Sequence, residues 1–460
     1  MTTTEYRAPA KNVDGRAWVA EQLQAMTVDG FATIAWWQQR WWRWRQGCWR
    51  ETEKSEVENW IVARLNTDFD DVIPEIVSRM LLQLRAAVAI DSELQAPCWL
   101  QPWDGAPDPK NLLVCRDRTV DLPAYLAGRS SWCWPPMPRL LNLSAIPHAF
   151  PAAATPPTRW LEFLGQLWPD DVESIETLQE FFGLCLLPET KYQKMLWLVG
   201  PSGGGKGTIL ALLEALLGAG NTAATSLKSL SSDFGFSALV GKLAALIPDA
   251  RLGRIDPAAV VEALLTLAAA DCVPVNAKHR AIVSLRLHAR IVMASNELPR
   301  LPDAASAMLR RLIILRLRRN FVGQENFELA ATICDNELPG ILRWSIDGLA
   351  RLRHRGHFRQ PASALQLIAT FRSQTSIEQF LVERCEEGEG LSVWADELYA
   401  AFQDFCRSQN IQNVPNKSTF GTQFAAARPA SDKLRATTGC PRPYYYTGLA
   451  LRPEYQTRRA

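Results

Sequence analysis

A glycine-rich loop between residues 200 and 208 constrains the fold of this chain more than any other feature of its sequence. It follows the apolar run MLWLVG, which predicts a buried strand, and opens the run GTILALLEALLG, which predicts a helix. Backbone N–H groups in such a loop turn inward around anionic oxygens, and the helix N-terminus adds positive potential. The sequence therefore predicts a phosphate-binding loop in an α/β fold. The loop consists of Gly200, Pro201, Ser202, Gly203, Gly204, Gly205, Lys206, Gly207 and Thr208.

Two residues of this loop and one acid further along the chain are candidates for binding nucleotide phosphates and magnesium. Lys206 is placed to reach the β- and γ-phosphates. The next residue is Gly207, where Ser or Thr usually binds magnesium, so Thr208 is the hydroxyl available to the metal. A second magnesium ligand is expected at the end of a neighbouring strand, and the run LAALIPD supplies Asp249 there.

The second acid expected beside Asp249 is missing. Ala250 occupies the next position, so the general base is open, with Asp256 and Glu262 as candidates. Asp249 has an alternative role as an ordinary turn or helix-cap residue, because single acids after strands are common. The missing acid keeps open the alternative of a protein that binds ATP with little turnover.

The third predicted strand, ARIVMAS, leads into two further candidate features. Asn296 follows it directly, and an amide at the carboxyl end of a buried strand can orient an attacking water or sense a γ-phosphate. The alternative for Asn296 is a turn residue before Pro299. A short helix then ends in Arg310 and Arg311, one of which is a candidate to reach the γ-phosphate of a neighbouring subunit. An arginine pair of this kind is otherwise a solvated helix face.

Strands alternate with helices through the central part of the chain. The strands MLWLVG, KLAALIP, ARIVMAS and LIILRL are almost continuously apolar, which predicts a parallel sheet with helices on both faces. In the N-terminal part, WWQQRWWRWRQGCWRE alternates aromatic and polar residues and predicts a β-hairpin. Composition shifts predict four regions: a Trp-rich α+β domain (1–110), a linker and helical collar (111–190), the phosphate-loop domain (191–360) and a small C-terminal domain (361–460).

Composition excludes several classes of protein. The 50 Lys and Arg residues balance 48 Asp and Glu residues, so only local patches could bind a polyanion. Ten cysteines are scattered without a CxxC pair, which gives little support to a zinc site. The longest apolar runs fall short of the roughly 18 residues that a membrane span needs, and the N-terminus has no signal-peptide core. We therefore expect a cytoplasmic protein with no membrane partner.

The order of these motifs resembles the helicase domain of phage and plasmid primase–helicases, which are superfamily 3 helicases of the AAA+ ATPase class. The segments that carry the resemblance are GPSGGGKGT, LAALIPDARL, VPVNAKHR, ARIVMASNELPRLPDAASAMLRRL and ELPGILRWSIDGLARL. The collar region that precedes the phosphate loop in that family is resembled by LLVCRDRTVDL and PPTRWLEFLGQLWPDDVESIETLQEFFGLCLLPETKYQKMLWLVGP. Its C-terminal winged-helix segment is resembled by SVWADELYAAFQDFCRSQNIQ with the later YYYTGLAL. The resemblance implies a hexameric ring that hydrolyses ATP with Mg²⁺ and moves on single-stranded or forked DNA. It further implies replication of a mobile element in the cytoplasm of a bacterial host.

The resemblance also implies roles for individual residues. By position, Lys206 and Thr208 correspond to the first, phosphate-binding motif of the family, and Asp249 corresponds to its second motif. Asn296 corresponds to the sensor. Arg311 or Arg310 corresponds to the arginine finger, which acts in trans on the neighbouring subunit. Lys278 matches the basic tip of a hairpin that grips the DNA backbone in the channel of the ring. VPVNAKHRAIVSL is a plausible hairpin that presents Lys278, His279 and Arg280 together, and a basic loop tip contacts phosphates regardless of sequence.

Two departures from the family limit what is carried over. Arg116 and Arg118 stand where the family usually keeps a short Asn-Gly turn, so this loop is expected to differ. Residues 1–150 contain no closely spaced acidic pair that suggests two-metal nucleotidyl transfer. We therefore do not expect a primase activity in this chain, and a separate primase or polymerase is an expected partner.

The sequence is compatible with two other functions and contains further basic clusters. A small-molecule nucleotide kinase also contains GKGT, but the collar before the loop and the Asn296 strand after it argue against that class. A replication initiator or loader that binds DNA with little motor activity is the alternative to a helicase. The Trp-rich N-terminus favours core aromatics over base stacking. The segment RLRHRGHFR and several C-terminal residues are candidate phosphate contacts. The latter are Lys433, Arg435, Arg442, Arg452, Arg458 and Arg459.

Overall fold

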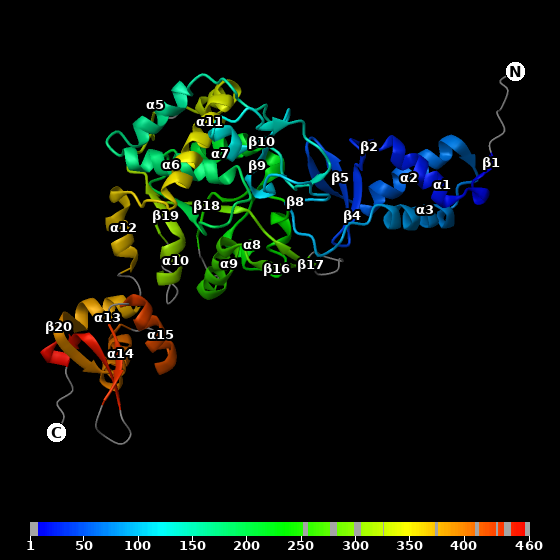
Figure 1. Cartoon of the computed structure of the whole chain (residues 1–460). Helices are drawn as coiled ribbons and strands as arrows, with labels where there is room; N and C mark the ends of the chain where they lie inside the picture. Colours follow the sequence, from blue (N-terminus) through cyan, green and yellow to red (C-terminus); the bar gives the residue numbers. More distant parts are fainter. Residues whose placement is uncertain are drawn as a thin grey trace.

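The centre of the molecule is a five-stranded parallel sheet (Figure 1). The computed structural model describes residues 8–251, 256–276, 283–298, 305–324, 326–372, 376–409, 414–428, 431–436 and 443–455. The phosphate-loop strand is an inner strand, with the strand before Asn296 on one side and the last strand on the other. In spatial order the strands are β14 (Thr222–Ala224), β15 (Ala244–Ile247), β18 (Arg290–Ser295), β13 (Met195–Val199) and β19 (Leu312–Arg316).

Helices cover both faces of this sheet, as the apolar strands predicted. Along β13, Leu196 and Leu198 point into one core, whereas Met195, Trp197 and Val199 point into the other. Figure 1 shows the helices above and below the sheet. The first face is covered by α5 (Thr158–Leu167), α6 (Val172–Cys185), α7 (Lys206–Leu217) and α11 (Leu329–Arg355). The second is covered by α8 (Leu227–Leu230), α9 (Pro257–Ala269), α10 (Ala305–Arg311) and α12 (Ala362–Arg372).

The Trp-rich segment forms an antiparallel sheet that joins the second core. Its strands are β4 (Ile34–Trp37), β5 (Arg40–Arg45) and β6 (Cys48–Thr52). The predicted hairpin is confirmed, with Gln46 and Gly47 both at positive φ in the turn between β5 and β6. Trp37, Trp42 and Trp49 are buried in the same cluster as Trp197 of the phosphate-loop strand. These tryptophans are therefore core residues, in agreement with the sequence-based preference over base stacking.

The remaining elements precede and follow these layers. The N-terminal helices are α1 (Gly15–Ala25), α2 (Lys54–Asp68) and α3 (Pro74–Ala87), with short strands β1 (Ala8–Pro9), β2 (Thr27–Val28), β3 (Phe31–Ala32) and β7 (Phe69–Asp70). Residues 98–141 contribute β8 (Cys98–Trp99), β9 (Leu112–Val114), β10 (Thr119–Asp121), α4 (Leu122–Leu126), β11 (Cys133–Trp134) and β12 (Leu140–Leu141). An antiparallel pair, β16 (Cys272–Val275) and β17 (Val283–Arg286), leads into β18. Among the described residues, no helix is long and apolar enough to cross a membrane.

The C-terminal part is a small unit with its own core. It contains α13 (Ser376–Arg384), β20 (Cys385–Trp394), α14 (Ala395–Ser408), α15 (Lys417–Ala427), β21 (Lys433–Arg435) and β22 (Tyr444–Leu451). The strands form an antiparallel sheet in the order β20-β22-β21, and Phe402, Phe405, Phe420 and Phe424 fill the space between sheet and helices. Figure 1 shows this unit below the main body, after α12.

A close crossing joins α6 to α11, which are far apart in the sequence. A Cβ at Gly183 would lie 2.2 Å from the carbonyl oxygen of Ser345, so the crossing requires glycine there. Beside it, the buried Glu180 carboxylate accepts a hydrogen bond at 2.8 Å from Nε of Arg351 and also pairs with Arg355. The two arginines satisfy a carboxylate that would otherwise be buried and unpaired.

Gly183→Ala should destabilise the protein because the added methyl group overlaps the backbone of α11. We expect the free energy of unfolding to fall by about 1–3 kcal/mol, measured by urea unfolding followed by tryptophan fluorescence. Gly165→Ala in α5 is the matched control, since a Cβ there meets nothing within 4 Å. This control should stabilise the helix by up to about 1 kcal/mol. Equal stability of the two variants would show that the crossing tolerates a wider separation.

Candidate nucleotide-binding site

The glycine-rich loop adopts a backbone that depends on two of its glycines. Gly203 and Gly205 have φ values of +68° and +85°, in the left-handed region that L side chains rarely adopt. A Cβ at Gly205 would also lie 2.9 Å from Leu167 and 3.0 Å from Phe163, both on α5. A Cβ at Gly207 would meet nothing within 4 Å, so this unusual position after the lysine is sterically free.

The lysine of the loop lies beside the candidate sensor. Lys206 Nζ donates hydrogen bonds to the carbonyl oxygens of Gly200 and Pro201, at 2.5 and 2.6 Å. It also contacts Asn296 Oδ1 at 3.2 Å. Burial lowers the pKa of Lys206, and the negative charge of Asp249 opposes that shift. Two residues 90 positions apart therefore meet at one ammonium group because β13 and β18 are neighbouring parallel strands.

Asp249 lies two residues beyond the end of β15, at the same edge of the sheet. Its carboxylate is exposed and accepts a hydrogen bond at 2.8 Å from Arg251 Nε. Ala250 is buried and donates its backbone N–H to Ala294 on β18, which leaves no side chain to act as a base there. The other two candidate bases are also accounted for: Asp256 caps α9 by accepting from the N–H of Ala258 at 3.0 Å, and Glu262 is exposed on that helix.

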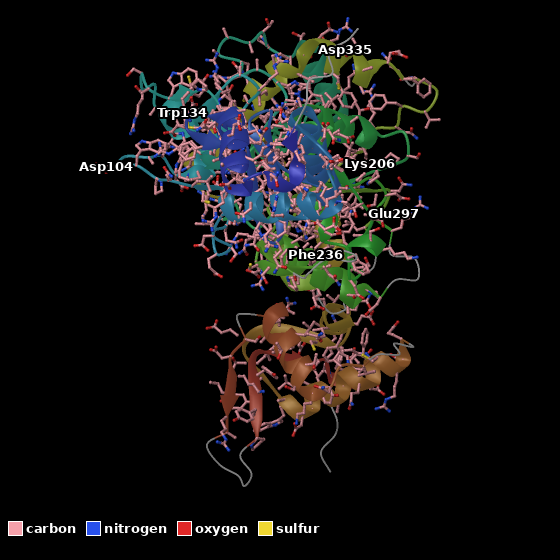
Figure 2. The ribbon with its side chains drawn as sticks, turned by 90° about the vertical axis from the view of Figure 1, so that its right-hand side faces the viewer. Asp104, Trp134, Lys206, Phe236, Glu297 and Asp335 are labelled. Atoms are coloured by element: carbon pink, nitrogen blue, oxygen red, sulfur yellow. The ribbon has the colours of Figure 1, made fainter. Side chains whose placement is uncertain are left out.

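An open cleft of about 730 Å³ lies beside the loop and contains residues that the sequence analysis missed. Glu297 carries the only carboxylate among the described residues that line it, next to Asn296. Figure 2 shows Lys206 and Glu297 on the same side of the main body. Arg316 and Arg318 line the cleft from the end of β19. Their position follows from strand pairing, because Arg316 lies opposite Val199, the last residue before the loop.

A second hollow of about 680 Å³ adjoins this cleft and shares the same two arginines. It lies between β19, the start of α12 and the segment that joins α5 to α6. Trp168 of that segment donates its indole N–H to the carbonyl oxygen of Arg316 at 2.9 Å, which fixes the end of the strand. Arg316 and Arg318 thus line both hollows. The sequence signal was the basic run RLRR at 316–319, which becomes informative only when the strand order is known.

The candidate arginine finger lies at the opposite edge of the sheet. Arg310 and Arg311 end α10, and the next residue, Leu312, pairs with Met195 at the start of β13. Four strand residues, roughly 13 Å, separate this edge from the loop. Lys194 donates a hydrogen bond to the carbonyl oxygen of Arg310 at 2.5 Å, and burial together with the charge of Arg311 lowers the pKa of Lys194. The structure therefore does not bring the arginine pair to the loop of its own chain.

The predicted DNA-contact residues Lys278, His279 and Arg280 lie outside the described residues. The strands on either side of them, β16 and β17, pair as an antiparallel hairpin up to Val275 and Val283. This pairing agrees with the hairpin expected from the sequence. Among the described residues, no group of three or more His, Cys, Asp or Glu side chains is arranged to hold a metal ion.

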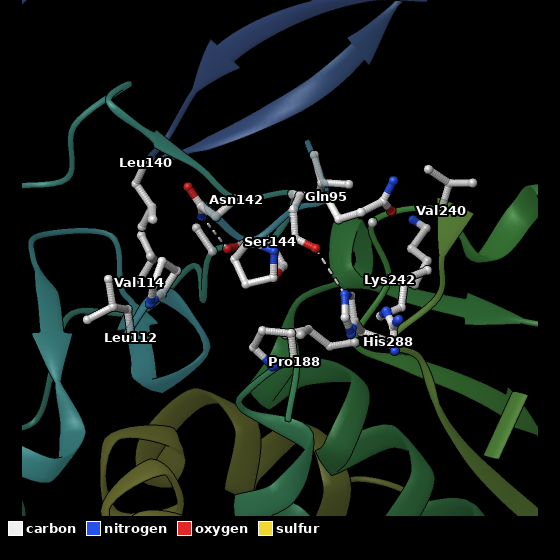
Figure 3. Close-up of a pocket in the computed structure, with 18 of the residues that line it drawn as sticks. Gln95, Leu112, Val114, Leu140, Asn142, Ser144, Pro188, Val240, Lys242 and His288 are labelled. Carbon is white, nitrogen blue, oxygen red and sulfur yellow. Dashed lines mark hydrogen bonds between the residues drawn. The ribbon is translucent and has the colours of Figure 1, made fainter. Parts of the chain in front are cut away.

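Another cavity, remote from the loop, lies where the Trp-rich sheet, residues 95–146 and the base of the β16–β17 hairpin meet (Figure 3). Its free space is about 40 Å³, enough for a few water molecules. His288 lies in its wall and contacts the carbonyl oxygen of Ala96 at 3.0 Å. Burial lowers the pKa of His288 to about 4, so the imidazole is neutral at pH 7. The cavity is therefore lined by segments that are far apart in the sequence.

Two protein families match separate parts of the chain. Residues 198–311 match a model described as "Family of unknown function (DUF5906)", and residues 375–435 match the model "Poxvirus D5 protein-like". The resemblance to the superfamily 3 helicase part of primase–helicases is confirmed. The first match spans the phosphate loop, Asp249, Asn296 and the arginine pair, and the second spans most of the small C-terminal unit.

Solved structures show the same overall fold at low sequence identity. Three apo structures of the NrS-1 C terminal region are similar, with TM-scores of 0.50, 0.50 and 0.51 and identities of 11, 12 and 12%. The similarity covers 94–95% of this chain and 99–100% of those chains. No curated protein matches the chain in sequence. The likeness therefore extends over nearly the whole chain but concerns the fold alone.

Arg318→Ala should weaken nucleotide triphosphate binding, since it removes a cation from the wall of the cleft beside the loop. A charge-assisted hydrogen bond contributes about 1.5–3 kcal/mol, so we expect a loss of roughly 10- to 100-fold in affinity for a fluorescent ATP analogue. Arg319→Ala is the matched control, because the Arg319 guanidinium lies over the ring of Phe321 and contacts Gln166. If both variants bind the analogue with the affinity of the unaltered protein, Arg318 does not contact the nucleotide.

Proposed function

We propose that the chain is an ATP-hydrolysing, ring-forming DNA helicase or translocase that acts in the replication of a phage, prophage or other mobile element. The observation that carries this proposal is the contact between Lys206 Nζ and Asn296 Oδ1 at the carboxyl edge of the sheet. A bound γ-phosphate would contact both the lysine of the phosphate-binding loop and the polar sensor on the neighbouring strand. The arginine pair at the other edge supports action between subunits rather than within one.

We further propose a division of the chain into four domains. We assign residues 191–360 to an AAA+ ATPase domain, preceded by the Trp-rich domain (1–110) and the linker and collar (111–190). We assign residues 361–460 to a winged-helix-like domain. Three helices and a three-stranded antiparallel sheet, with β21 and β22 adjacent at its edge, support this last assignment.

ATP would occupy the cleft with its phosphates on the loop. The backbone of residues 200–208 and the N-terminus of α7 would hold the phosphates. Lys206 would give up its hydrogen bonds to the two loop carbonyl oxygens and donate to oxygens of the β- and γ-phosphates instead. Thr208 and Asp249 offer a hydroxyl and a carboxylate, which are oxygen ligands that Mg²⁺ prefers. Bound Mg²⁺ would neutralise charge that develops on the phosphates.

The residues around the γ-phosphate would orient water and stabilise charge. Asn296 would position the attacking water, since its amide already lies beside Lys206. We assign Glu297 as the candidate base, because it supplies the carboxylate in the cleft that Ala250 does not. Arg311, or its neighbour Arg310, would reach the γ-phosphate of the next subunit in a ring, most simply a hexamer. Hydrolysis would then depend on assembly.

DNA would pass through the channel of this ring. The hairpin of β16 and β17 would present Lys278, His279 and Arg280 to the phosphates of single-stranded or forked DNA. These residues supply contacts that are independent of base sequence, as a translocase requires. A separate primase or polymerase would supply primers in the cytoplasm of the bacterial host.

A replication initiator or loader with little motor activity is the second candidate function. Ala250 is buried where a second acid would stand, and Asp249 is paired with Arg251. Both observations favour a site that binds ATP more readily than it hydrolyses it. Turnover in the presence of DNA separates the two candidates, because only the motor couples hydrolysis to movement along the strand.

Single-stranded DNA should stimulate the ATPase rate of the assembled protein, measured on material sized with and without a non-hydrolysable ATP analogue. Lys278→Ala should lower the DNA-stimulated rate about tenfold or more and leave the basal rate nearly unchanged, because a channel contact acts only when DNA is bound. ATP-dependent assembly with little turnover would favour the initiator or loader. Equal loss of both rates in the variant would contradict the role of the hairpin.

A mixture of Lys206→Ala and Arg311→Ala subunits should recover ATPase activity that neither variant has alone. Each mixed interface can combine an intact loop from one subunit with an intact arginine from its neighbour, so about a quarter of randomly mixed interfaces are complete. The rate is measured against the mixing ratio, with each variant alone as its control. If Arg311→Ala alone keeps full activity, Arg310→Ala is tested in the same way. Full activity of both variants would contradict the role of either arginine as the finger.

A further inference from the structure

A buried serine at the end of β18 connects the phosphate-loop strand to the turn that carries the candidate sensor. Ser295 is the last residue of β18 and is only 4% exposed. Because side chains alternate along a strand, Ser295 lies on the same face of the sheet as Met293. Trp197 of β13 pairs with Met293 and belongs to the same core. The indole N–H of Trp197 donates a hydrogen bond to the Ser295 hydroxyl oxygen at 2.8 Å.

The same hydroxyl group closes the turn around Asn296. The Ser295 O–H donates a hydrogen bond to the carbonyl oxygen of Glu297 at 2.6 Å. Asn296 is the residue between these two, so the bond constrains the backbone on both sides of it. A hydroxyl has one proton and two lone pairs, so it can donate to Glu297 and accept from Trp197 at once. The backbone carbonyl oxygen of Ser295 accepts the N–H of Gly200, where the phosphate loop begins, at 3.2 Å.

The indole of Trp197 gives this hydroxyl a fixed partner. The ring is completely buried and packs in the cluster that contains Trp37, Trp42 and Trp49. Close packing holds a side chain in one orientation, and a buried N–H without an acceptor is destabilising. The Ser295 hydroxyl supplies that acceptor. Because its oxygen faces the indole N–H, its proton points away from the indole and toward the turn.

The position of Asn296 depends on this turn more than on side-chain packing. The Asn296 side chain is exposed, whereas the residues before it in β18 are buried. Its amide oxygen nevertheless lies 3.2 Å from Lys206 Nζ. The backbone at residues 295–297 therefore decides where the amide points. Glu297, the candidate base, enters the cleft from the same turn. A small displacement of groups that orient a reactant lowers the rate strongly.

We propose that Ser295, oriented by Trp197, is a positioning residue for recognition of the γ-phosphate. It would hold the turn so that Asn296 faces Lys206 and, when ATP is bound, the γ-phosphate. Ser295 itself would touch no nucleotide. The inference rests on the proposed role of Asn296 as the sensor. It predicts that ATP turnover and the preference for ATP over ADP depend on a buried hydroxyl, while the affinity for ADP does not.

The test measures kcat for ATP in the full chain, and the affinities for a fluorescent non-hydrolysable ATP analogue and for fluorescent ADP. In Ser295→Ala, kcat and the preference for the ATP analogue over ADP should each fall about 3- to 10-fold, the effect of losing one neutral hydrogen bond. The affinity for ADP should be unchanged. Ser295→Thr keeps the hydroxyl and should retain both properties. Ser345→Ala is the matched control, since Ser345 is also buried but donates its hydroxyl proton to Ile341 within α11.

A double variant shows whether Ser295 acts through Asn296. In Asn296→Ala, the further change Ser295→Ala should leave kcat and the nucleotide preference as they are, because the group that Ser295 positions is already absent. Equal effects in both backgrounds would overturn the proposal, since Ser295 would then act without the sensor. Thermal melting establishes that each variant is folded. Ser295→Cys replaces the alanine variant if that variant does not fold, because a thiol fills the space but is a weak donor.

The remaining outcomes separate this inference from the proposed motor. Unchanged kcat and nucleotide preference in Ser295→Ala would overturn the inference and leave the motor standing. A parallel loss of ADP affinity would also overturn it, because the damage would then extend to the phosphate loop in general. If the unaltered chain binds ATP with little turnover, as an initiator or loader would, the binding measurement alone decides. A chain that binds no nucleotide would contradict the proposed function, and the role of Ser295 with it.

Discussion

Parallel pairing of β13 with both β18 and β19 is the constraint on which the rest of the molecule depends. It aligns the carboxyl ends of these strands, so that the phosphate loop, Asn296 and Arg316 emerge at one edge. The same pairing places Leu312 opposite Met195 and so holds the arginine pair at the other edge. One sheet register therefore places the phosphate loop and the arginine pair at opposite edges of the sheet.

The phosphate loop is supported from outside the sheet as well. Phe163 and Leu167 of α5 lie against Gly205, and Trp168 fixes the end of β19. On the other face, the Trp-rich sheet shares a core with Trp197, and Arg50 donates to the carbonyl oxygen of Gly220 and to Asn221 at 3.0 and 2.6 Å. Helix α5 and the Trp-rich sheet are thus joined to the parallel sheet and its loop through side-chain contacts.

Much of this architecture was visible in local patterns. Continuous apolar strands predicted the parallel sheet covered on both faces, and the aromatic alternation around Gln46 and Gly47 predicted a hairpin, both confirmed. The glycine-rich loop predicted the role of Lys206, and its place directly after a buried strand predicted that of Asn296; the structure brings the two side chains together. Arg318 and Glu297 were missed, because a polar residue after a strand gains meaning only when the neighbouring strand is known. Asp256 seemed a candidate base, yet its carboxylate caps a helix.

The sequence by itself determined the strands of the central sheet and the phosphate loop. These follow from short-range properties: side-chain periodicity and the φ values that glycine permits. Only the tertiary structure decided which strands are neighbours and which arginines face the cleft. Those relations depend on side-chain packing between segments far apart in the chain, and no local pattern specifies it.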